Sequence, residues 1–231
     1  MVNIDLHRNS LIVILREIYS DVLLRTALGF KGGTAAMLFY ELPRFSVDLD
    51  FDLLDLEKKE AVFDKLKAIL PQFGTVSQAQ DKQYTLFFLI KYKDGERNLK
   101  VEISKRPVNS EYMVKNYLGI SMLVMKEEDM AASKLAALLT RRKFASRDVF
   151  DVWFFLKNQW KIDEVVLTEK TGLSLREALE KAEKQVQALK KAELLSGLGE
   201  LLDAKQKAWV REKLVDDVVF YLRLYRESLK A

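Results

Sequence analysis

Cysteine and histidine are the residues that this sequence most lacks. The 231 residues include no cysteine and one histidine, His7. Without cysteine the chain cannot form a disulfide framework, a thiolate zinc site or a cysteine nucleophile. A single histidine excludes multi-histidine metal sites. A catalytic serine–histidine pair would be possible only if His7, in the N-terminal segment, supplied the histidine. We expect His7 on the surface of the first helix, and any metal chemistry must then use oxygen ligands.

A large excess of one charge is also missing. The 38 Lys and Arg against 34 Asp and Glu leave a net charge of +4, too small and too mixed to identify a nucleic-acid-binding protein. With 49% hydrophobic and 31% charged residues, disordered and fibrous classes are excluded. The length fits one domain with an elaboration.

No long apolar run opens the chain. Within residues 1–19 the apolar positions are interrupted by Asp5, Arg8, Arg16 and Glu17, so we expect neither a signal peptide nor a membrane span. Together with the missing cysteines, this predicts a cytoplasmic protein that has no membrane partner.

Periodicity predicts an α+β fold. In the first half, helical spacing marks residues 4–24, 34–42 and 57–70, and strand patterns mark residues 47–53, 84–92 and 99–104. Pro43 should stop the second helix. In the second half, helical spacing covers residues 126–143, 146–158, 174–191 and 206–229. We therefore expect a mixed β-sheet domain with helices over residues 1–120, followed by a helical domain over residues 121–231.

The strand 47–53 carries two aspartates that draw attention. Asp48 and Asp50 are two residues apart, so both carboxylates project from the same sheet face, about 6 to 7 Å apart. Their repulsion costs about 2 to 3 kcal/mol at an effective dielectric constant of 20. A divalent cation such as Mg²⁺ or Mn²⁺ would remove this cost. A solvated edge strand would relieve it equally well.

Two further features are weaker alone. Gly32-Gly33-Thr34 lies at an expected turn into a helix, where free amides and the helix dipole favour phosphate, although many glycine pairs form only turns. Glu102 lies on the polar face of strand 99–104. It would complete an acidic triad if that strand pairs with the Asp48 strand, and otherwise it is an ordinary exposed glutamate.

These residues resemble a known family. Gly32-Gly33, a helix and then Arg44-x-Ser46-x-Asp48-x-Asp50 are similar to the DNA polymerase β type nucleotidyltransferases, and within them to the AbiEii/AbiGii toxins of type IV toxin–antitoxin and phage-abortive systems. Lys134, followed by Arg147-Asp148-x-x-Asp151, also resembles this family. The resemblance covers roughly residues 10 to 160.

The resemblance implies transfer of a nucleoside monophosphate from a nucleoside triphosphate to an acceptor, with two Mg²⁺ or Mn²⁺ ions held by Asp48 and Asp50. It implies that Glu102 helps to deprotonate the attacking hydroxyl, and that the helical domain contributes Lys134 and Asp148 or Asp151 to the active-site cleft. The residues that it places around the nucleotide are Lys31, Gly32, Gly33, Thr34, Arg44 and Ser46.

The helical residues have simpler explanations as well. Ser146 could cap a helix whose first turn holds Asp148, and Arg147 could pair with Asp151 four residues later. From Lys134 to Arg147 there are five basic residues and no acid. This run fits an RNA-backbone surface or a solvated helix face.

We therefore expect the toxin component of a toxin–antitoxin or phage-defence pair, with a nucleoside triphosphate as substrate, tRNA or another RNA as acceptor, and a cognate antitoxin as partner. Two alternatives remain. One is a non-catalytic nucleotide or RNA binder on the same scaffold. The other is a nucleotidyltransferase whose acceptor is a small molecule, as in antibiotic-modifying enzymes.

Overall fold

The chain folds into a mixed β-sheet with helices, followed by a helical region. The computed structural model describes residues 3–107 and 109–229. Contacts divide the chain into two compact units, Met1–Met125 and Lys126–Ala231. The α+β class expected from the sequence is confirmed. The domain boundary that we expected after residue 120 falls at the start of the last strand of the first unit, Ile120–Met125.

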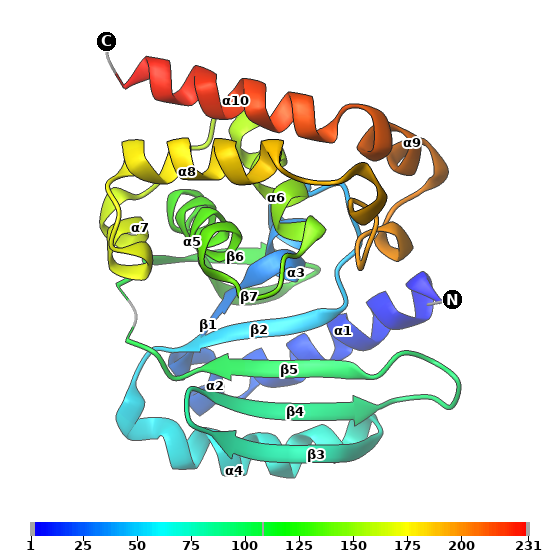
Figure 1. The fold of residues 1–231 in the computed structure, drawn as a ribbon. Helices are drawn as coiled ribbons and strands as arrows, with labels where there is room; N and C mark the ends of the chain where they lie inside the picture. Colours follow the sequence, from blue (N-terminus) through cyan, green and yellow to red (C-terminus); the bar gives the residue numbers. More distant parts are fainter. Residues whose placement is uncertain (1–2, 108, 230–231) are drawn as a thin grey trace. The chain divides into compact units, whose positions relative to one another are not determined.

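The sheet belongs to the first unit. Among the described residues its strands follow the order β3-β4-β5-β2-β1-β7-β6 (Figure 1). The pairs β1·β7 and β2·β5 are parallel, and the other neighbours are antiparallel. The strands are β1 (Leu28–Lys31), β2 (Asp48–Leu53), β3 (Thr75–Lys82), β4 (Thr85–Lys91), β5 (Leu99–Ser104), β6 (Tyr112–Tyr117) and β7 (Ile120–Met125).

Strand β2, which carries the paired aspartates, lies in the middle of this sheet. It pairs with β1 on one side and with β5 on the other. The alternative of a solvated edge strand is therefore wrong. Its apolar residues Leu49 and Phe51 are fully buried, as the alternation predicted.

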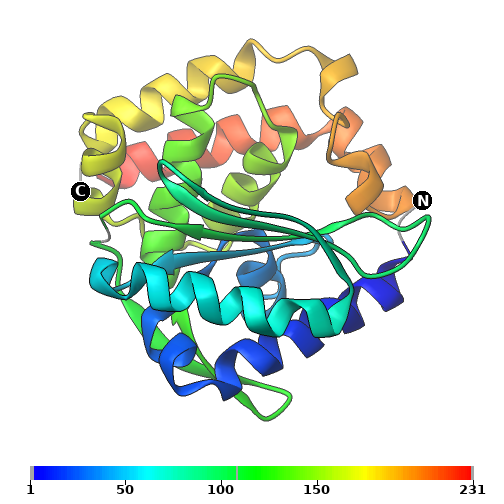
Figure 2. The same ribbon diagram turned by 90° about the horizontal axis from the view of Figure 1, so that it is seen from below.

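Three helices of this unit, α1 (Ile4–Ser20), α2 (Val22–Ala27) and α4 (Lys59–Ile69), cover the apolar face of the sheet. The unit also contains α3 (Gly32–Phe39) and short 3₁₀ turns at Leu56–Lys58 and Leu70–Phe73. Helices α1, α2 and α4 lie side by side along one face (Figure 2). The Tyr19 ring of α1 lies 6.3 Å from Phe51, and the Phe63 ring of α4 lies 5.2 Å from Phe88. Because side chains alternate along a strand, the aspartates of β2 point to the opposite face.

Local chemistry explains where the helices differ from expectation. The helix expected over residues 4–24 is two helices, because Asp21 takes an extended conformation and accepts hydrogen bonds from the amides of Leu23 and Leu24. Helix α3 begins at the glycine pair and ends at Phe39, before Pro43 is reached, and Glu41 follows with a φ of 59°.

The second unit is helical. Its helices are α5 (Glu127–Thr140), α6 (Ser146–Lys157), α7 (Glu164–Thr171), α8 (Leu175–Gln187), α9 (Ala204–Glu212) and α10 (Leu214–Ser228), with 3₁₀ turns at Lys191–Glu193 and Gly199–Leu201. The helix expected over residues 206–229 is broken at Lys213, and α7 had not been expected. Trp153 and Phe155 are buried in its core.

Candidate functional site

The acidic face of β2 carries carboxylates that are already partnered. Asp48 is 8% exposed and Asp52 4%, while Asp50 between them is half-buried. The Lys100 ammonium of β5 lies 3.2 Å from Asp48 Oδ2. This contact follows from the strand register, which pairs Asp48 with Lys100. A cation within the sheet therefore relieves part of the repulsion that the sequence had suggested a metal ion would remove.

Glu102 lies beside the aspartates because its strand pairs with the Asp48 strand, which is the condition for an acidic triad. Strands β2 and β5 are parallel neighbours, and their register pairs Asp50 with Glu102. Paired residues of adjacent strands point to the same face, so the half-buried Glu102 shares the aspartates' face. Across the residues that the structure describes, however, no three acidic or histidine side chains lie close enough together to hold a metal ion. The triad is thus adjacent in register without forming a three-carboxylate site.

The glycine pair fits closely against β2 and the segment before it. Gly32 opens α3 with a φ of +80°, a conformation that L-residues rarely adopt, and a Cβ there would lie 2.6 Å from Asp50 Oδ2. A Cβ on Gly33 would lie 2.6 Å from Arg44 Nη2 and 2.8 Å from Ser46 Oγ. The absence of both side chains thus lets the start of α3 approach Asp50, Arg44 and Ser46.

The polar residues around this turn mainly connect α3 to β2. Thr34 is fully buried; its hydroxyl donates to the Asp48 carbonyl and lies 3.0 Å from Ser46 Oγ. Arg44 is 5% exposed, and its Nη1 donates to the Phe45 carbonyl over 2.9 Å. Lys31 precedes α3 and makes no side-chain cap. Thr34, Ser46 and Arg44 therefore hold the Gly32-Gly33 turn in place beside the carboxylates.

A second cluster on the same sheet face was not predicted. The Lys31 ammonium lies 2.5 Å from Asp52 Oδ1, and the Tyr112 hydroxyl donates to Asp52 Oδ2 over 2.6 Å. The Tyr112 ring lies over Gly29, where a Cβ would lie 2.5 Å from the ring Cζ. Lys31, expected at the nucleotide, is thus held by Asp52. The sequence contains no sign of this cluster, because the fold that brings Tyr112 of β6 to Asp52 of β2 is not visible in it.

Within the second unit, the predicted residues form an ion-pair cluster. Lys134 Nζ lies 2.8 Å from Asp151 Oδ2 and 3.3 Å from Asp148 Oδ1, and Arg141 Nε lies 3.1 Å from Asp148 Oδ2. The two carboxylates are at most 1% exposed. The structure therefore brings Lys134, Asp148 and Asp151 together in one unit, as it brings Asp48, Asp50 and Glu102 together in the other.

The two local explanations for these residues are wrong. The N-cap of α6 is Ala145, and Ser146 Oγ instead donates to the Glu193 carbonyl over 3.0 Å. Asp151 pairs with Lys134 of α5, and no contact joins it to Arg147 among the described residues. The buried acids of α6 are thus matched by cations from outside their own helix.

His7 is fully buried, so its expected surface position is wrong. Its Nε2 lies 2.9 Å from the Val47 carbonyl and must donate there, because a carbonyl can only accept. In the neutral ring Nδ1 then accepts from the Tyr92 hydroxyl at 2.7 Å. Burial, the largest effect, lowers the pKa of His7 below its ordinary value of 6.5. The neutral imidazole fixes the residue that precedes Asp48.

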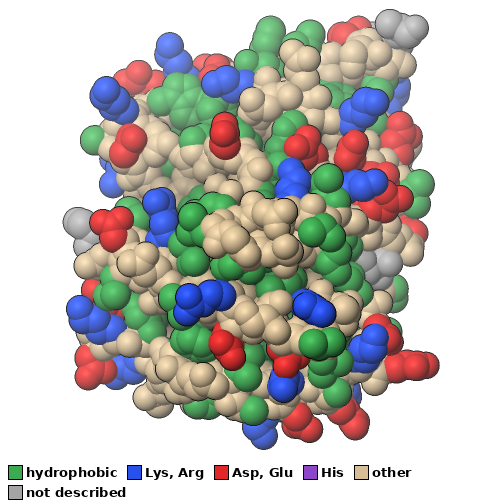
Figure 3. Space-filling view, turned by 180° about the vertical axis from the view of Figure 1, so that it is seen from behind, with side chains coloured by type: hydrophobic (Ala, Val, Ile, Leu, Met, Phe, Trp, Pro, Cys, Tyr) green, Lys and Arg blue, Asp and Glu red, His purple; other side chains and the backbone are tan. Residues whose placement is uncertain are grey.

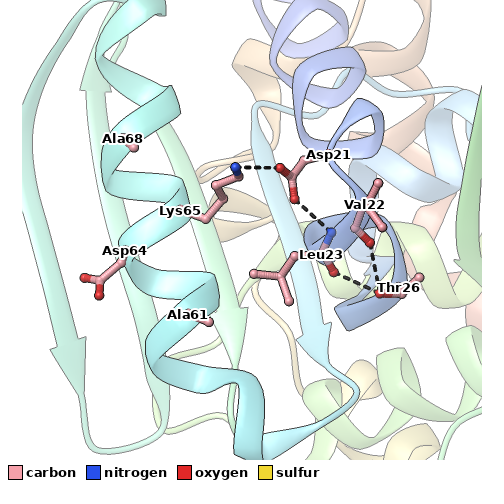
Figure 4. A pocket seen from close by; sticks show the side chains of 8 residues that line it. All are labelled: Asp21, Val22, Leu23, Thr26, Ala61, Asp64, Lys65 and Ala68. Carbon is pink, nitrogen blue, oxygen red and sulfur yellow. Dashed lines mark hydrogen bonds and ion pairs between the residues drawn. The ribbon is translucent and has the colours of Figure 1, made fainter.

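A pocket in the first unit lies away from these residues. It has a volume of about 740 Å³ and opens between α2 and α4, lined by Asp21, Val22, Thr26 and Lys65 among others (Figure 4). Lys65 Nζ pairs with Asp21 Oδ2 at 2.9 Å across it. Because α2 and α4 cover the apolar face of the sheet, this pocket contains none of the predicted site residues.

Solved structures share this fold. A provisionally assigned nucleotidyltransferase from H. pylori matches with a TM-score of 0.63 and 22% identity, over 98% of this chain and 96% of its own. JHP933 from Helicobacter pylori matches with a TM-score of 0.56 and 22% identity, over 97% of this chain and 95% of its own. An antigenic nucleotidyltransferase-like protein from Paracoccidioides brasiliensis matches with a TM-score of 0.52 and 15% identity, over 89% of this chain and 97% of its own. At these identities the likeness defines the fold as that of nucleotidyltransferase-like proteins.

A family model narrows this class. The model described as nucleotidyl transferase AbiEii toxin, type IV TA system, matches residues 13–220. The chain therefore belongs to the AbiEii nucleotidyltransferase toxin family, as its motifs indicated. No significant match was found among curated proteins. None of the described helices is long and apolar enough to span a membrane.

Proposed function

We propose that this protein transfers a nucleoside monophosphate from a nucleoside triphosphate to an RNA acceptor, with tRNA the first candidate, and acts as the toxin of a type IV toxin–antitoxin or phage-defence system. One observation carries the proposal. The Gly32-Gly33 start of α3 lies so close to Asp50 that a Cβ on Gly32 would contact its carboxylate. Phosphate-binding amides and paired carboxylates are therefore neighbours, as transfer of a phosphate-linked group requires.

The donor set suits Mg²⁺, or Mn²⁺, held by Asp48 and Asp50. Magnesium is usually bound by one or two carboxylates together with substrate phosphates, rather than by an all-protein cage. Two carboxylates on one sheet face, with no three-acid cluster among the described residues, match this mode. When bound, such ions stabilise the attacking and leaving oxygens of an in-line displacement. Lys100 would have to yield its contact with Asp48 Oδ2.

The remaining residues are assigned by position. Amides at the start of α3 would bind the triphosphate, while Arg44, Ser46 and Thr34 support that turn. Glu102, beside Asp50 in register, is the candidate to accept the proton of the attacking hydroxyl. The family resemblance assigns Lys134 and Asp148 or Asp151 to the active site as well, and that role remains part of the proposal.

Membership of a toxin family supports a cognate antitoxin as partner and a cytoplasmic site of action, where nucleotides and RNA are available. The RNA acceptor is supported by the basic run from Lys134 to Arg147, in which Arg142, Lys143 and Arg147 pair with no carboxylate among the described residues.

The test is a transfer assay with each of the four α-labelled nucleoside triphosphates, total tRNA, and either Mg²⁺ or EDTA. The proposal predicts label in RNA for at least one triphosphate, with Mg²⁺ only. Nucleotide binding without transfer would instead identify a non-catalytic binder. Label that appears only on small molecules when a cell extract replaces the RNA would identify a different acceptor.

A further inference from the structure

The basic residues between α5 and α6 fall into two groups. Lys134 and Arg141 neutralise the buried Asp148 and Asp151. The other three cations, Arg142, Lys143 and Arg147, pair with no carboxylate within the described part of the chain. Arg142 and Lys143 are exposed, and Arg147 is half-buried. The structure thus separates cations that stabilise the fold from cations that are available to a partner.

A second segment brings more positive charge to the same place. Ser146 Oγ donates to the Glu193 carbonyl, which holds the 3₁₀ turn Lys191–Glu193 beside the start of α6. Lys190 and Lys191 enter this turn; both are exposed, and neither pairs with a carboxylate among the described residues. Two segments that are far apart in the sequence, each with exposed cations, are therefore joined at the start of α6.

An aromatic ring lies among these cations. Phe144 follows Arg142 and Lys143 directly and is 37% exposed. No ring contact involves it in the described structure, whereas Phe150, Phe154 and Phe155 on the adjoining helix all pack against other rings. Single-stranded nucleic acids are commonly bound by cations that contact the phosphates and aromatic rings that stack on the bases.

We propose that Arg142, Lys143, Phe144 and Arg147, with Lys190 and Lys191, form a binding surface for single-stranded RNA. This inference rests on the proposed function, and it assigns the acceptor to a particular surface of the helical unit. RNA is favoured over an acidic protein because an exposed ring among the cations can stack on a base, while an acidic polypeptide would need the cations alone.

RNA affinity can be measured separately from transfer. Fluorescence anisotropy of a short labelled single-stranded RNA, in EDTA and without nucleotide, reports binding when no chemistry can occur. The charge variant is Arg142→Ala/Lys143→Ala. Its matched control is Lys181→Ala/Lys184→Ala, which removes two exposed cations from α8. The plot of log association constant against log salt concentration has a negative slope. We expect the charge variant to reduce the magnitude of this slope by about 1.4, because each phosphate contact on a single strand contributes about 0.7. The control should keep the wild-type slope.

The ring is tested by size-matched changes. Phe144→Leu should weaken binding about fivefold or more with no change in salt slope, since stacking does not depend on salt, and Phe144→Trp should retain wild-type affinity. Equal slopes for the charge variant and its control, unchanged affinity of Phe144→Leu, or no RNA binding by the wild type would each overturn the inference. Equal competition by poly-glutamate would also overturn it, in favour of an acidic protein partner.

These outcomes separate the two proposals. Suppose that the wild type labels RNA and that the charge variant binds RNA as well as the wild type does. This result would overturn the assignment of RNA binding to this surface and leave the proposed function standing. A wild type that binds RNA through this surface but transfers no label to it would overturn the proposed function alone.

Discussion

Individual buried polar residues explain much of this molecule's local geometry. His7, Thr34, Asp52 and Asp148 are each at most 4% exposed, and each contacts a partner from another element. Polar groups at such depth are stable only when they are hydrogen-bonded or paired. The sequence shows the residue types, but their partners depend on strand order and helix packing. This is why His7 was misplaced and the Asp52 cluster was missed.

The buried histidine predicts a pH dependence of stability. The pKa of His7 is lowered in the folded state, so the folded protein binds fewer protons than the unfolded chain as pH falls. The free energy of unfolding should therefore decrease below about pH 6.5, by at most about 1.4 kcal/mol per pH unit from this group. Because His7 is the sole histidine, an NMR titration measures its pKa directly. A pKa at or above 6.5 would contradict the buried neutral ring. A His7→Asn variant should lose this part of the pH dependence.

The contact between Gly29 and Tyr112 predicts a coupled pair. Gly29→Ala should destabilise the protein by about 1 to 3 kcal/mol, because the new methyl group meets the tyrosine ring. The same change in a Tyr112→Ala background should cost far less, since the ring is gone. Urea unfolding of the four proteins completes the double-mutant cycle. Equal costs in both backgrounds would show that the ring does not lie over Gly29.

At the scale of elements, the periodicity of the hydrophobic residues predicted where helices and strands lie better than it predicted where each one begins and ends. Strand 99–104 and the helices near residues 127–140 and 146–157 were found within a few residues. Strands β3 and β6 were missed because most of their residues are exposed and neither strand has a buried face. The split between α1 and α2 follows from the capping side chain of Asp21, a signal that lay within an otherwise helical pattern.

The packing of α5 on α6 predicts the effect of removing its cation. Lys134→Met would leave Asp148 and Asp151 with one fewer partner at 0–1% exposure, and should destabilise the helical unit by about 3 to 5 kcal/mol. Lys181→Met, at an exposed site on α8, is the control and should change stability little. Adding Asp148→Asn and Asp151→Asn should restore part of the loss. Near-wild-type urea unfolding of Lys134→Met would show that the ion-pair cluster is not a stabilising element.

This pairing affects how activity data for Lys134 are interpreted. A loss of transfer in Lys134→Met could follow from destabilisation alone. Lys134→Arg retains the charge, so a well-folded Lys134→Arg protein without activity would support a direct catalytic role.

At the scale of the whole molecule, the small net charge averages over opposed regions. Residues 48–57 contain five acids and no base, and residues 134–147 contain five bases and no acid. On the face shown in Figure 3, basic and acidic side chains are intermixed. Local runs and the partners of each charge therefore carry more information about function than the total does.

The candidate site was predictable from sequence where it depends on spacing along one strand or turn. The glycine pair, the aspartates two residues apart and the polar face of Glu102 are of this kind. The counter-ions Lys100 and Lys31 reach the aspartates from the strands on either side of β2, and the Tyr112 hydroxyl reaches Asp52 from β6 at the far end of the sheet. Their roles depend on register between strands, which one sequence does not reveal.

The central claim is that Asp48 and Asp50 support nucleotidyl transfer. Its most direct test compares the wild type with Asp48→Asn/Asp50→Asn in the transfer of α-labelled nucleotide to RNA in Mg²⁺, with circular dichroism and thermal unfolding to verify the fold. Asparagine keeps the shape but removes both charges, so a folded double variant should transfer no label above background. Undiminished transfer by that variant would contradict the account.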